Sequence, residues 1–136
     1  MNGSLIDTNI LLDIATGDPQ WQKWSEEQLR AAAVRGPLCI NPIIYAELAP
    51  AFRSMTELDR WLGPPLVLHR LPLPYAAGWI AAQAFVRYRR SGGTKNLPLP
   101  DFYIGAHAEL EDLALVTRDA TRYQTYFPQV HLIAPP

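Results

Sequence analysis

The chain has 136 residues, of which 49% are hydrophobic and 18% charged, and these values are typical of one soluble globular domain. Its formal net charge of −1 excludes a bulk attraction to nucleic acid, so any such contact needs a local basic patch. The single cysteine, Cys39, excludes an intrachain disulfide. The N-terminus does not resemble a leader, and no run reaches the ~18 apolar residues that a membrane span needs. We therefore expect a cytoplasmic protein that does not enter a membrane.

The first third of the chain predicts two strands separated by two helices. Residues 3–6 form a short apolar strand, and Thr8 is expected to cap a helix over residues 9–15, because its hydroxyl can accept from an early helix N–H. A second helix is predicted over residues 20–35. Residues 38–40 then form an apolar strand, in which Cys39 is expected to be buried.

The middle of the chain begins with a clear helix start. Asn41 is a good cap residue, and Pro42 suits the first helical position. We expect this helix to end near Pro50 and a second helix to cover residues 55–62. The apolar run 66–68 is the predicted third strand.

The last part of the chain continues the alternation. Long and medium helices are predicted over residues 75–90 and 101–111, a strand over 114–117, a short helical turn over 123–127 and a final strand over 130–133. Strands that alternate with helices predict a parallel sheet with right-handed crossovers, and strands that are apolar on both faces need helices on both sides. The expected fold class is therefore α/β, a three-layer sandwich with a central parallel sheet of about five strands flanked by helices.

Four acidic residues stand in positions that a parallel sheet brings together. Asp7 and Asp119 each follow a predicted strand, Asp101 begins a helix, and Glu47 lies within one. Each alone has an ordinary explanation: a cap, a turn, a favourable place near a helix dipole or an exposed helix position. Together they are expected to gather at the carboxyl edge of the strands, where carboxylates repel and favour a divalent cation with oxygen ligands.

Basic residues precede the third of these acids. Arg87, Arg89, Arg90 and Lys95 surround a Gly-Gly loop, where they either complement a helix dipole or bind phosphates, and Arg118 can join them beside Asp119.

Two other polar side chains near these acids are expected to lie outside the site. Asp13, six residues after Asp7, is expected on a helix surface. His107 points away from Asp101 at the same spacing, so packing or surface exposure is expected for its imidazole.

The segments around the acids resemble a known family. Residues 5–13 with Asp7-Thr8-Asn9, residues 44–48, residues 100–108 and residues 115–119 with Thr117-Arg118-Asp119 are similar, in order and spacing, to the motifs of PIN-domain ribonucleases. The similarity is greatest to the VapC-type toxins of prokaryotic toxin–antitoxin pairs, and it extends to the C-terminal segment.

The resemblance implies a single PIN domain over residues 1–136 with endoribonuclease activity. It implies that Asp7, Glu47, Asp101 and Asp119 bind Mg²⁺ or Mn²⁺ and catalyse cleavage of RNA, and that Thr8, Asn9 and Thr117 support them. It also implies a VapB-like antitoxin and a homodimer.

Other functions remain open at this point. The chain could be a PIN-fold RNA-processing nuclease, or a binding module, outside a toxin–antitoxin pair. A haloacid-dehalogenase-type phosphatase needs a second aspartate two residues after the first, where this chain has Asn9. A receiver-like switch needs paired early acids and a lysine after a late strand, whereas Lys95 precedes a helix.

Overall fold

A parallel sheet with the strand order β3-β2-β1-β4-β5 forms the centre of the computed structural model, which describes residues 3–95 and 99–136. The strands are β1 (Ser4–Ile6), β2 (Leu38–Ile40), β3 (Leu68–Arg70), β4 (Ala114–Val116) and β5 (Leu132–Ile133). The helices are α1 (Thr8–Thr16), α2 (Gln22–Arg35), α3 (Pro42–Leu48), the 3-10 turn η1 (Ala49–Ala51), α4 (Met55–Trp61), α5 (Tyr75–Arg90), α6 (Pro100–Leu110) and α7 (Ala120–Tyr126).

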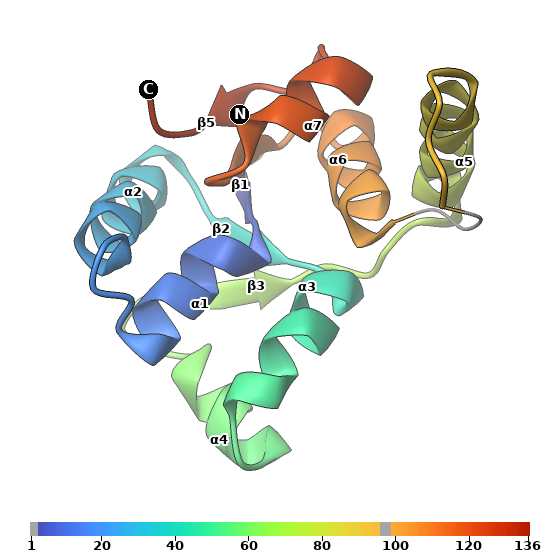
Figure 1. Ribbon diagram of the computed structural model, residues 1–136. Helices are drawn as coiled ribbons and strands as arrows, with labels where there is room; N and C mark the ends of the chain where they lie inside the picture. The colour runs from blue at the N-terminus through green and yellow to red at the C-terminus, as the bar shows by residue number, and fades with distance from the viewer. Residues whose placement is uncertain (1–2, 96–98) are drawn as a thin grey trace.

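The order of the strands explains the layers. The chain moves outward from β1 through β2 to β3, then returns across the sheet to β4 and β5, and every neighbouring pair is parallel. Right-handed crossovers in opposite directions place their helices on opposite faces. Accordingly, α1 to α4 lie on one side of the strands and α5, α6 and α7 on the other (Figure 1). The predicted three-layer α/β architecture is confirmed.

The inner strands and their covering helices form one apolar core. Strands β1, β2 and β4 are buried at every position, as expected for a sheet covered on both faces. Helix α6 packs closely against the C-terminal segment at Gly105, where an added Cβ would overlap the ring of Phe127. Phe102 on the same helix is completely buried and contacts Phe127 and Tyr126.

The predicted third strand was wrong in its position. It was expected over residues 66–68, but β3 covers Leu68–Arg70, and Val67 is exposed. In β3 only Leu68 is buried, while His69 and Arg70 are exposed. Since β3 is an edge strand, one buried residue suffices to anchor it, and polar residues are tolerated along the rest.

The start of α1 differs from the prediction by one residue. Asp7 caps the helix by accepting from the backbone N–H of Thr8 at 2.8 Å, and Thr8 is the first helical residue. The predicted cap of α3 is confirmed, because Asn41 Oδ1 accepts from the N–H of Ile44 at 3.0 Å. The predicted C-terminal helical turn begins three residues too late, since α7 starts at Ala120.

Cys39 is buried in β2, as predicted. In the part of the chain that the structure describes, no helix has both the length and the apolar character needed to cross a membrane.

Candidate functional site

The four acidic residues line one cavity at the carboxyl edge of β1 and β4. The cavity has a volume of about 440 Å³ and is lined by Asp7, Thr8, Asn9, Leu12, Glu47, Asp101 and Asp119. Strands β1 and β4 are neighbours, and the crossovers that follow them run in opposite directions. Such a point in an open α/β sheet leaves a crevice between the diverging helices, and this is where ligands bind. The topology therefore brings together residues more than 100 positions apart.

Asp7 is the most buried of the four carboxylates, with 4% of its surface exposed. Its Oδ2 accepts from the hydroxyls of Thr117 at 2.7 Å and Tyr123 at 3.1 Å. Burial, together with the nearby charge of Asp101, raises the pKa of Asp7 to about 6 in spite of these hydrogen bonds. The surroundings thus disfavour the charged form of Asp7. A bound cation would stabilise that charged form.

Asp101 lies in the first turn of α6 and is half-buried. Burial raises its pKa, and the charge of Asp119 acts in the same direction. The guanidinium of Arg122, whose Nη1 lies 3.5 Å from Asp101 Oδ2, lowers that pKa in part. Asp101 therefore interacts electrostatically with both Asp7 and Asp119 and links them in one acidic group.

Glu47 and Asp119 lie at the exposed rim of the cavity. Thr8 Oγ1 donates to Glu47 Oε1 at 2.8 Å, so the start of α1 orients a carboxylate on α3. The backbone N–H of Asp119 donates to Thr117 Oγ1 at 3.0 Å. Glu47 is exposed, as expected if it were an ordinary position on the surface of a helix. Its carboxylate, however, lines the cavity that the other acids share.

The three polar residues named as supports lie among these contacts. Thr8 contacts Glu47, and Thr117 contacts Asp7. Asn9 Nδ2 lies 3.4 Å from Thr117 Oγ1, and its Oδ1 accepts from the backbone N–H of Arg118 at 3.1 Å. The residues that the resemblance implied as supports therefore lie within hydrogen-bonding distance of the acids or of one another.

Tyr123 is a residue of this site that the sequence analysis missed. It is completely buried on α7, and its hydroxyl donates to Asp7 and also interacts with Asp101. Burial and the neighbouring carboxylates raise the pKa of Tyr123, so its phenol stays neutral and acts as a hydrogen-bond donor to the acids. The sequence carries little signal for it, because the helix was expected to begin only at residue 123, whereas Asp119 is the N-cap of α7 and lies one helical turn before Tyr123.

The donor set fits a hydrated divalent ion. Among residues 3–95 and 99–136, no three carboxylate, imidazole or thiol groups are arranged to enclose one ion by themselves. Mg²⁺ does not need such a cage, since it keeps several waters and takes one or two carboxylates directly. Asp7 and Asp101, which both interact with the Tyr123 hydroxyl, would be two such carboxylates, and Asp119 and Glu47 line the same cavity.

The predicted basic residues divide into two groups. Arg87, Arg89, Arg90 and Lys95 are exposed at or just beyond the C-terminal end of α5. Arg87 Nη2 donates to the carbonyl of Tyr126 at 2.9 Å, and Arg89 Nη1 donates to that of Lys95 at 2.6 Å. Arg118, by contrast, is engaged by Asp13 through Nε and Nη2 at 2.7 and 3.0 Å.

The expectation that Asp13 lies on a helix surface was wrong. Its side chain is buried and also accepts from Ser25 Oγ at 2.7 Å. Helix α2 packs over α1 at this point and covers the residue, which a reading of α1 alone could not reveal.

His107 is fully buried in packing between helices, one of the two outcomes expected for it. Its Nδ1 lies 3.0 Å from Asn41 Nδ2, and its Nε2 lies 2.6 Å from Glu111 Oε2. Since Asn41 Oδ1 is used to cap α3, the amide NH₂ must donate to Nδ1, which places the imidazole proton on Nε2. The result is a hydrogen-bonded connection between α3 and α6, the helices that carry Glu47 and Asp101.

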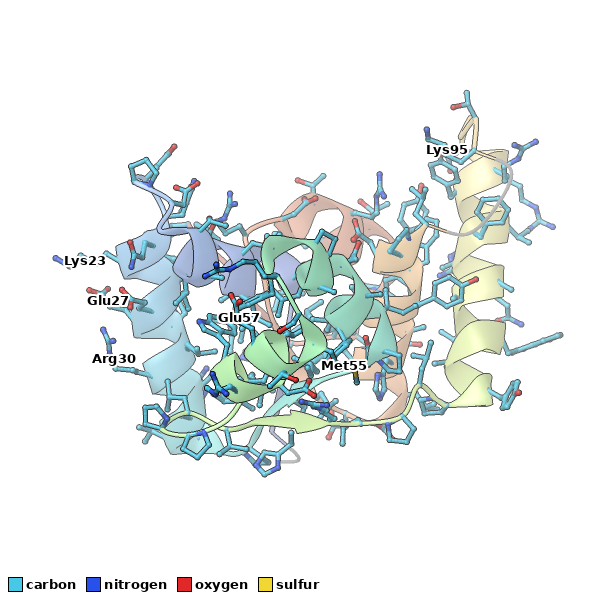
Figure 2. The ribbon with its side chains drawn as sticks, turned by 90° about the horizontal axis from the view of Figure 1, so that it is seen from below. Lys23, Glu27, Arg30, Met55, Glu57 and Lys95 are labelled. Atoms are coloured by element: carbon cyan, nitrogen blue, oxygen red, sulfur yellow. The ribbon has the colours of Figure 1, made fainter. Side chains whose placement is uncertain are left out.

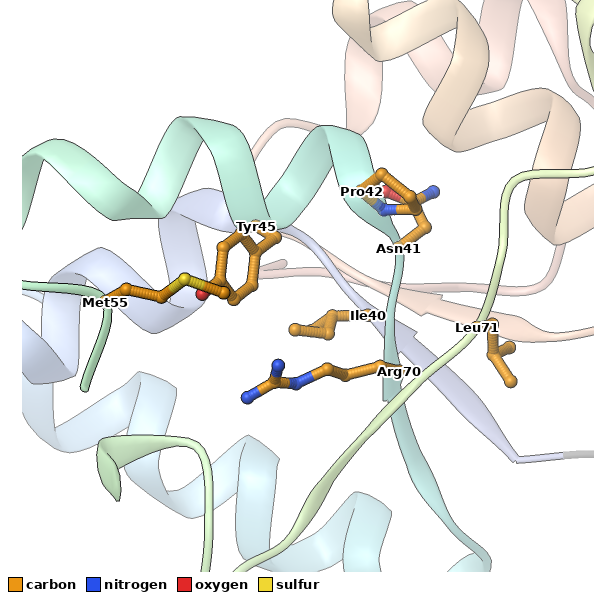
Figure 3. Close-up of a pocket in the computed structure, with 7 residues that line it drawn as sticks. All are labelled: Ile40, Asn41, Pro42, Tyr45, Met55, Arg70 and Leu71. Carbon is orange, nitrogen blue, oxygen red and sulfur yellow. The ribbon is translucent and has the colours of Figure 1, made fainter. Parts of the chain in front are cut away.

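A second cavity, of about 240 Å³, lies beyond the ends of β2 and β3 (Figure 3). It is lined by Ile40, Asn41, Pro42, Tyr45, Met55, Arg70 and Leu71. Arg70 Nη2 is paired with Asp59 at 2.8 Å, and its guanidinium lies over the ring of Tyr45. None of the described residues that line it carries a carboxylate, so the two cavities differ in chemistry although they share an edge of the sheet.

Comparison with known proteins gives a family and a fold. The family model described as PIN domain matches residues 4–128. No curated protein matches the chain.

Three solved structures resemble the chain over 98% of both lengths. They are VapBC2 from Rickettsia felis bound to a DNA fragment from their promoter (TM-score 0.74, 18% identity), DNA-bound VapBC from Salmonella typhimurium (0.70, 22%) and a toxin–antitoxin complex from Klebsiella pneumoniae (0.71, 23%). At this level of identity the likeness establishes the fold.

Proposed function

The chain belongs to the PIN domain family, and from that premise we propose that it is a metal-dependent endoribonuclease and the toxin of a toxin–antitoxin pair. One observation carries the proposal: four carboxylates from four separate segments of the chain line one cavity at the switch point of the sheet. Two of these carboxylates have pKa values raised by burial and by one another. The proposed catalytic unit is a single PIN domain over residues 1–136, working in the cytoplasm.

Asp7 and Asp101 are the residues that would hold Mg²⁺ or Mn²⁺, with Asp119 and Glu47 completing the site. When bound, such an ion polarises a phosphodiester and makes water a better nucleophile near neutral pH. The chain's own residues prepare the site for this. Thr117 and Tyr123 fix one oxygen of Asp7 by donating to it.

The rim residues have a different role in this proposal. Thr8 holds Glu47 against α1, so this exposed carboxylate faces the cavity instead of bulk solvent. From there Glu47 and Asp119 can orient the water that attacks the phosphorus, or accept its proton. Arg122 beside Asp101 can turn from the carboxylate toward a phosphate oxygen once a metal neutralises the acid.

RNA is the proposed substrate, and the end of α5 is its proposed binding surface. Arg87, Arg89, Arg90 and Lys95 lie there, and Figure 2 shows Lys95 beyond the end of the helix. Because α5 packs along α6, this basic surface belongs to the same helical layer as Asp101. With a net charge of −1, the protein needs such a local patch to attract phosphates.

An antitoxin is the proposed protein partner. The three solved structures described above are VapBC or toxin–antitoxin complexes, two of them with DNA. By that likeness we propose that this chain binds a VapB-like antitoxin and forms a homodimer. A PIN-fold nuclease, or an RNA-binding module outside such a pair, is the alternative.

Purified protein incubated with total cellular RNA tests the proposal. We expect cleavage with Mg²⁺ or Mn²⁺, no cleavage with a chelator and none by the Asp101→Asn variant. Sequencing the new RNA ends identifies the target. RNA that is bound but left intact by the wild-type protein with metal would favour the binding module and contradict the enzyme.

A further inference from the structure

A partly buried ion pair lies just outside the acidic cavity. Asp13 on α1 is 2% exposed, and both of its oxygens are bonded by the guanidinium of Arg118. Ser25 on α2 donates to the same carboxylate, and the guanidinium carbon lies 5.1 Å from the ring centroid of Trp21. Such two-point binding fixes the direction of an arginine side chain as well as its charge.

The backbone of Arg118 belongs to the short loop between β4 and α7. On one side of it, Thr117 donates to Asp7; on the other, Asp119 reaches the cavity. The Arg118 N–H donates to Asn9. Helix α1 therefore holds this loop at two points about one turn apart, through Asn9 at the backbone and through Asp13 at the side chain.

We infer that Asp13 and Arg118 are a positioning pair for the metal site, and that Arg118 is not a contact for RNA phosphates. The role of the pair at a metal site rests on the proposed function, whereas its role in holding the loop does not. The guanidinium donates twice to Asp13, and moving it to a phosphate would leave a buried carboxylate without its cation. Arg118 instead fixes the loop so that Thr117 stays on Asp7 and Asp119 stays at the cavity.

The chain offers a control of the same chemistry at a more exposed position. Arg70 also pairs with an aspartate, Asp59, and also lies over an aromatic ring, that of Tyr45 at 5.2 Å. It does so at the apolar cavity, away from the acids. Arg118→Met and Arg70→Met each remove one guanidinium and keep a long apolar stem. Arg118→Lys keeps the charge, and it supplies a second variant if Arg118→Met folds poorly.

Amide hydrogen exchange in the metal-free protein is the first measurement. We expect exchange at positions 118 and 119 to be roughly tenfold faster in Arg118→Met, about the effect of losing one hydrogen bond to a charged group. Arg118→Lys should recover part of the protection, and Arg70→Met should leave both amides as in the wild type. Unchanged protection in Arg118→Met would overturn the inference, whatever the protein does with metal or RNA.

Mn²⁺ affinity and RNA affinity are the second measurement, made well below the melting temperature of each variant. Arg118→Met should weaken Mn²⁺ binding by ~10–100-fold, as loss of a group that orients a ligand does. Affinity for a fluorescent single-stranded RNA, and its dependence on salt, should not change. A weaker RNA affinity with a smaller salt slope and normal Mn²⁺ binding would make Arg118 a phosphate contact and reject the inference. If wild-type protein binds no Mn²⁺, the proposed function fails, while the exchange rates still decide how the loop is held.

Discussion

The two cavities at the carboxyl edge of the sheet have opposite chemistry. The one beyond β1 and β4 gathers four carboxylates, whereas the one beyond β2 and β3 is apolar, and its arginine is already paired. The difference follows from topology. The crossovers after β1 and β4 diverge and leave a crevice, while those after β1 and β2 run in the same direction, so that α1 to α4 lie on the same side of the sheet. A cavity is therefore a good candidate for a metal site when the strand order explains its position and when several carboxylates line it together.

The largest expected effect separates the two cavities by the same chemical change. Asp7→Asn should reduce metal-dependent RNA cleavage by more than roughly a hundredfold, because loss of a ligand costs more than the ~10–100-fold typical of groups that only orient one. Asp59→Asn, which weakens the ion pair beside the apolar cavity, should leave cleavage intact. Rate measurements on purified variants, with circular dichroism to verify folding, make the comparison. Equal losses in both would show that the acidic cavity is not special.

Proton competition is the next test, and it acts on the acidic cavity alone. Because the pKa of Asp7 is raised to about 6, Mn²⁺ affinity should fall by roughly tenfold between pH 7 and pH 5 as the proton displaces the metal. Isothermal titration calorimetry measures this directly. Affinity that does not change over this range would place the metal away from Asp7.

The stability of the metal-free protein should move the opposite way. Folded Asp7 keeps its proton to about pH 6, above the ordinary value of 3.8, so its contribution to stability is fully present below about pH 4 and is lost as pH rises through 6. The loss is at most about 3 kcal/mol. Asp7→Asn should therefore raise the melting temperature at pH 7.5 but not at pH 4. A variant less stable than wild type at pH 7.5 would contradict this account.

These titration effects come from a cluster that the sequence located only in part. The four acids and the fold were predictable because strand ends, helix starts and alternation are local signals that a parallel sheet combines in one way. Tyr123 and Asp13 were not, since the contacts of each depend on how α7 and α2 lie against the remainder of the chain. The shift of β3 has another cause. Leu66 and Val67 have the apolar character typical of a strand, so the sequence favoured them. The strand includes exposed His69 and Arg70 instead, which is possible because β3 lies at the edge of the sheet.

A smaller effect is expected at the basic surface. Replacing both Arg87 and Arg90 by alanine should weaken RNA affinity roughly fivefold at 0.15 M salt and reduce the slope of log K against log salt by about 1.4, or ~0.7 for each single-strand phosphate contact. Mn²⁺ affinity should not change. The matched control is Lys23→Ala with Arg30→Ala, which removes two exposed cations that point outward from α2 (Figure 2). If the control pair weakens binding equally, net charge rather than a specific surface attracts the RNA.

The smallest effect should come from the apolar cavity. Met55 is 69% exposed at its wall, so Met55→Ser should change the free energy of unfolding by less than about 0.5 kcal/mol and leave RNA cleavage unaltered. Urea titration and the cleavage assay measure the two quantities. A clear loss of cleavage would mean that the apolar cavity participates in catalysis and that its contrast with the acidic one is misleading.

The hydrogen bonds of His107 offer a spectroscopic reporter. Its imidazole is confined to one tautomer by Asn41 on one side and Glu111 on the other. The two ring nitrogens of such an imidazole have well-separated ¹⁵N resonances, and these would merge toward an average if α3 and α6 moved apart and the tautomers interconverted. The imidazole of His107 can therefore report in solution, without an added label, on the spacing of the helices that carry Glu47 and Asp101. Its ¹⁵N spectrum would show whether that spacing is kept while metal, RNA or a partner binds.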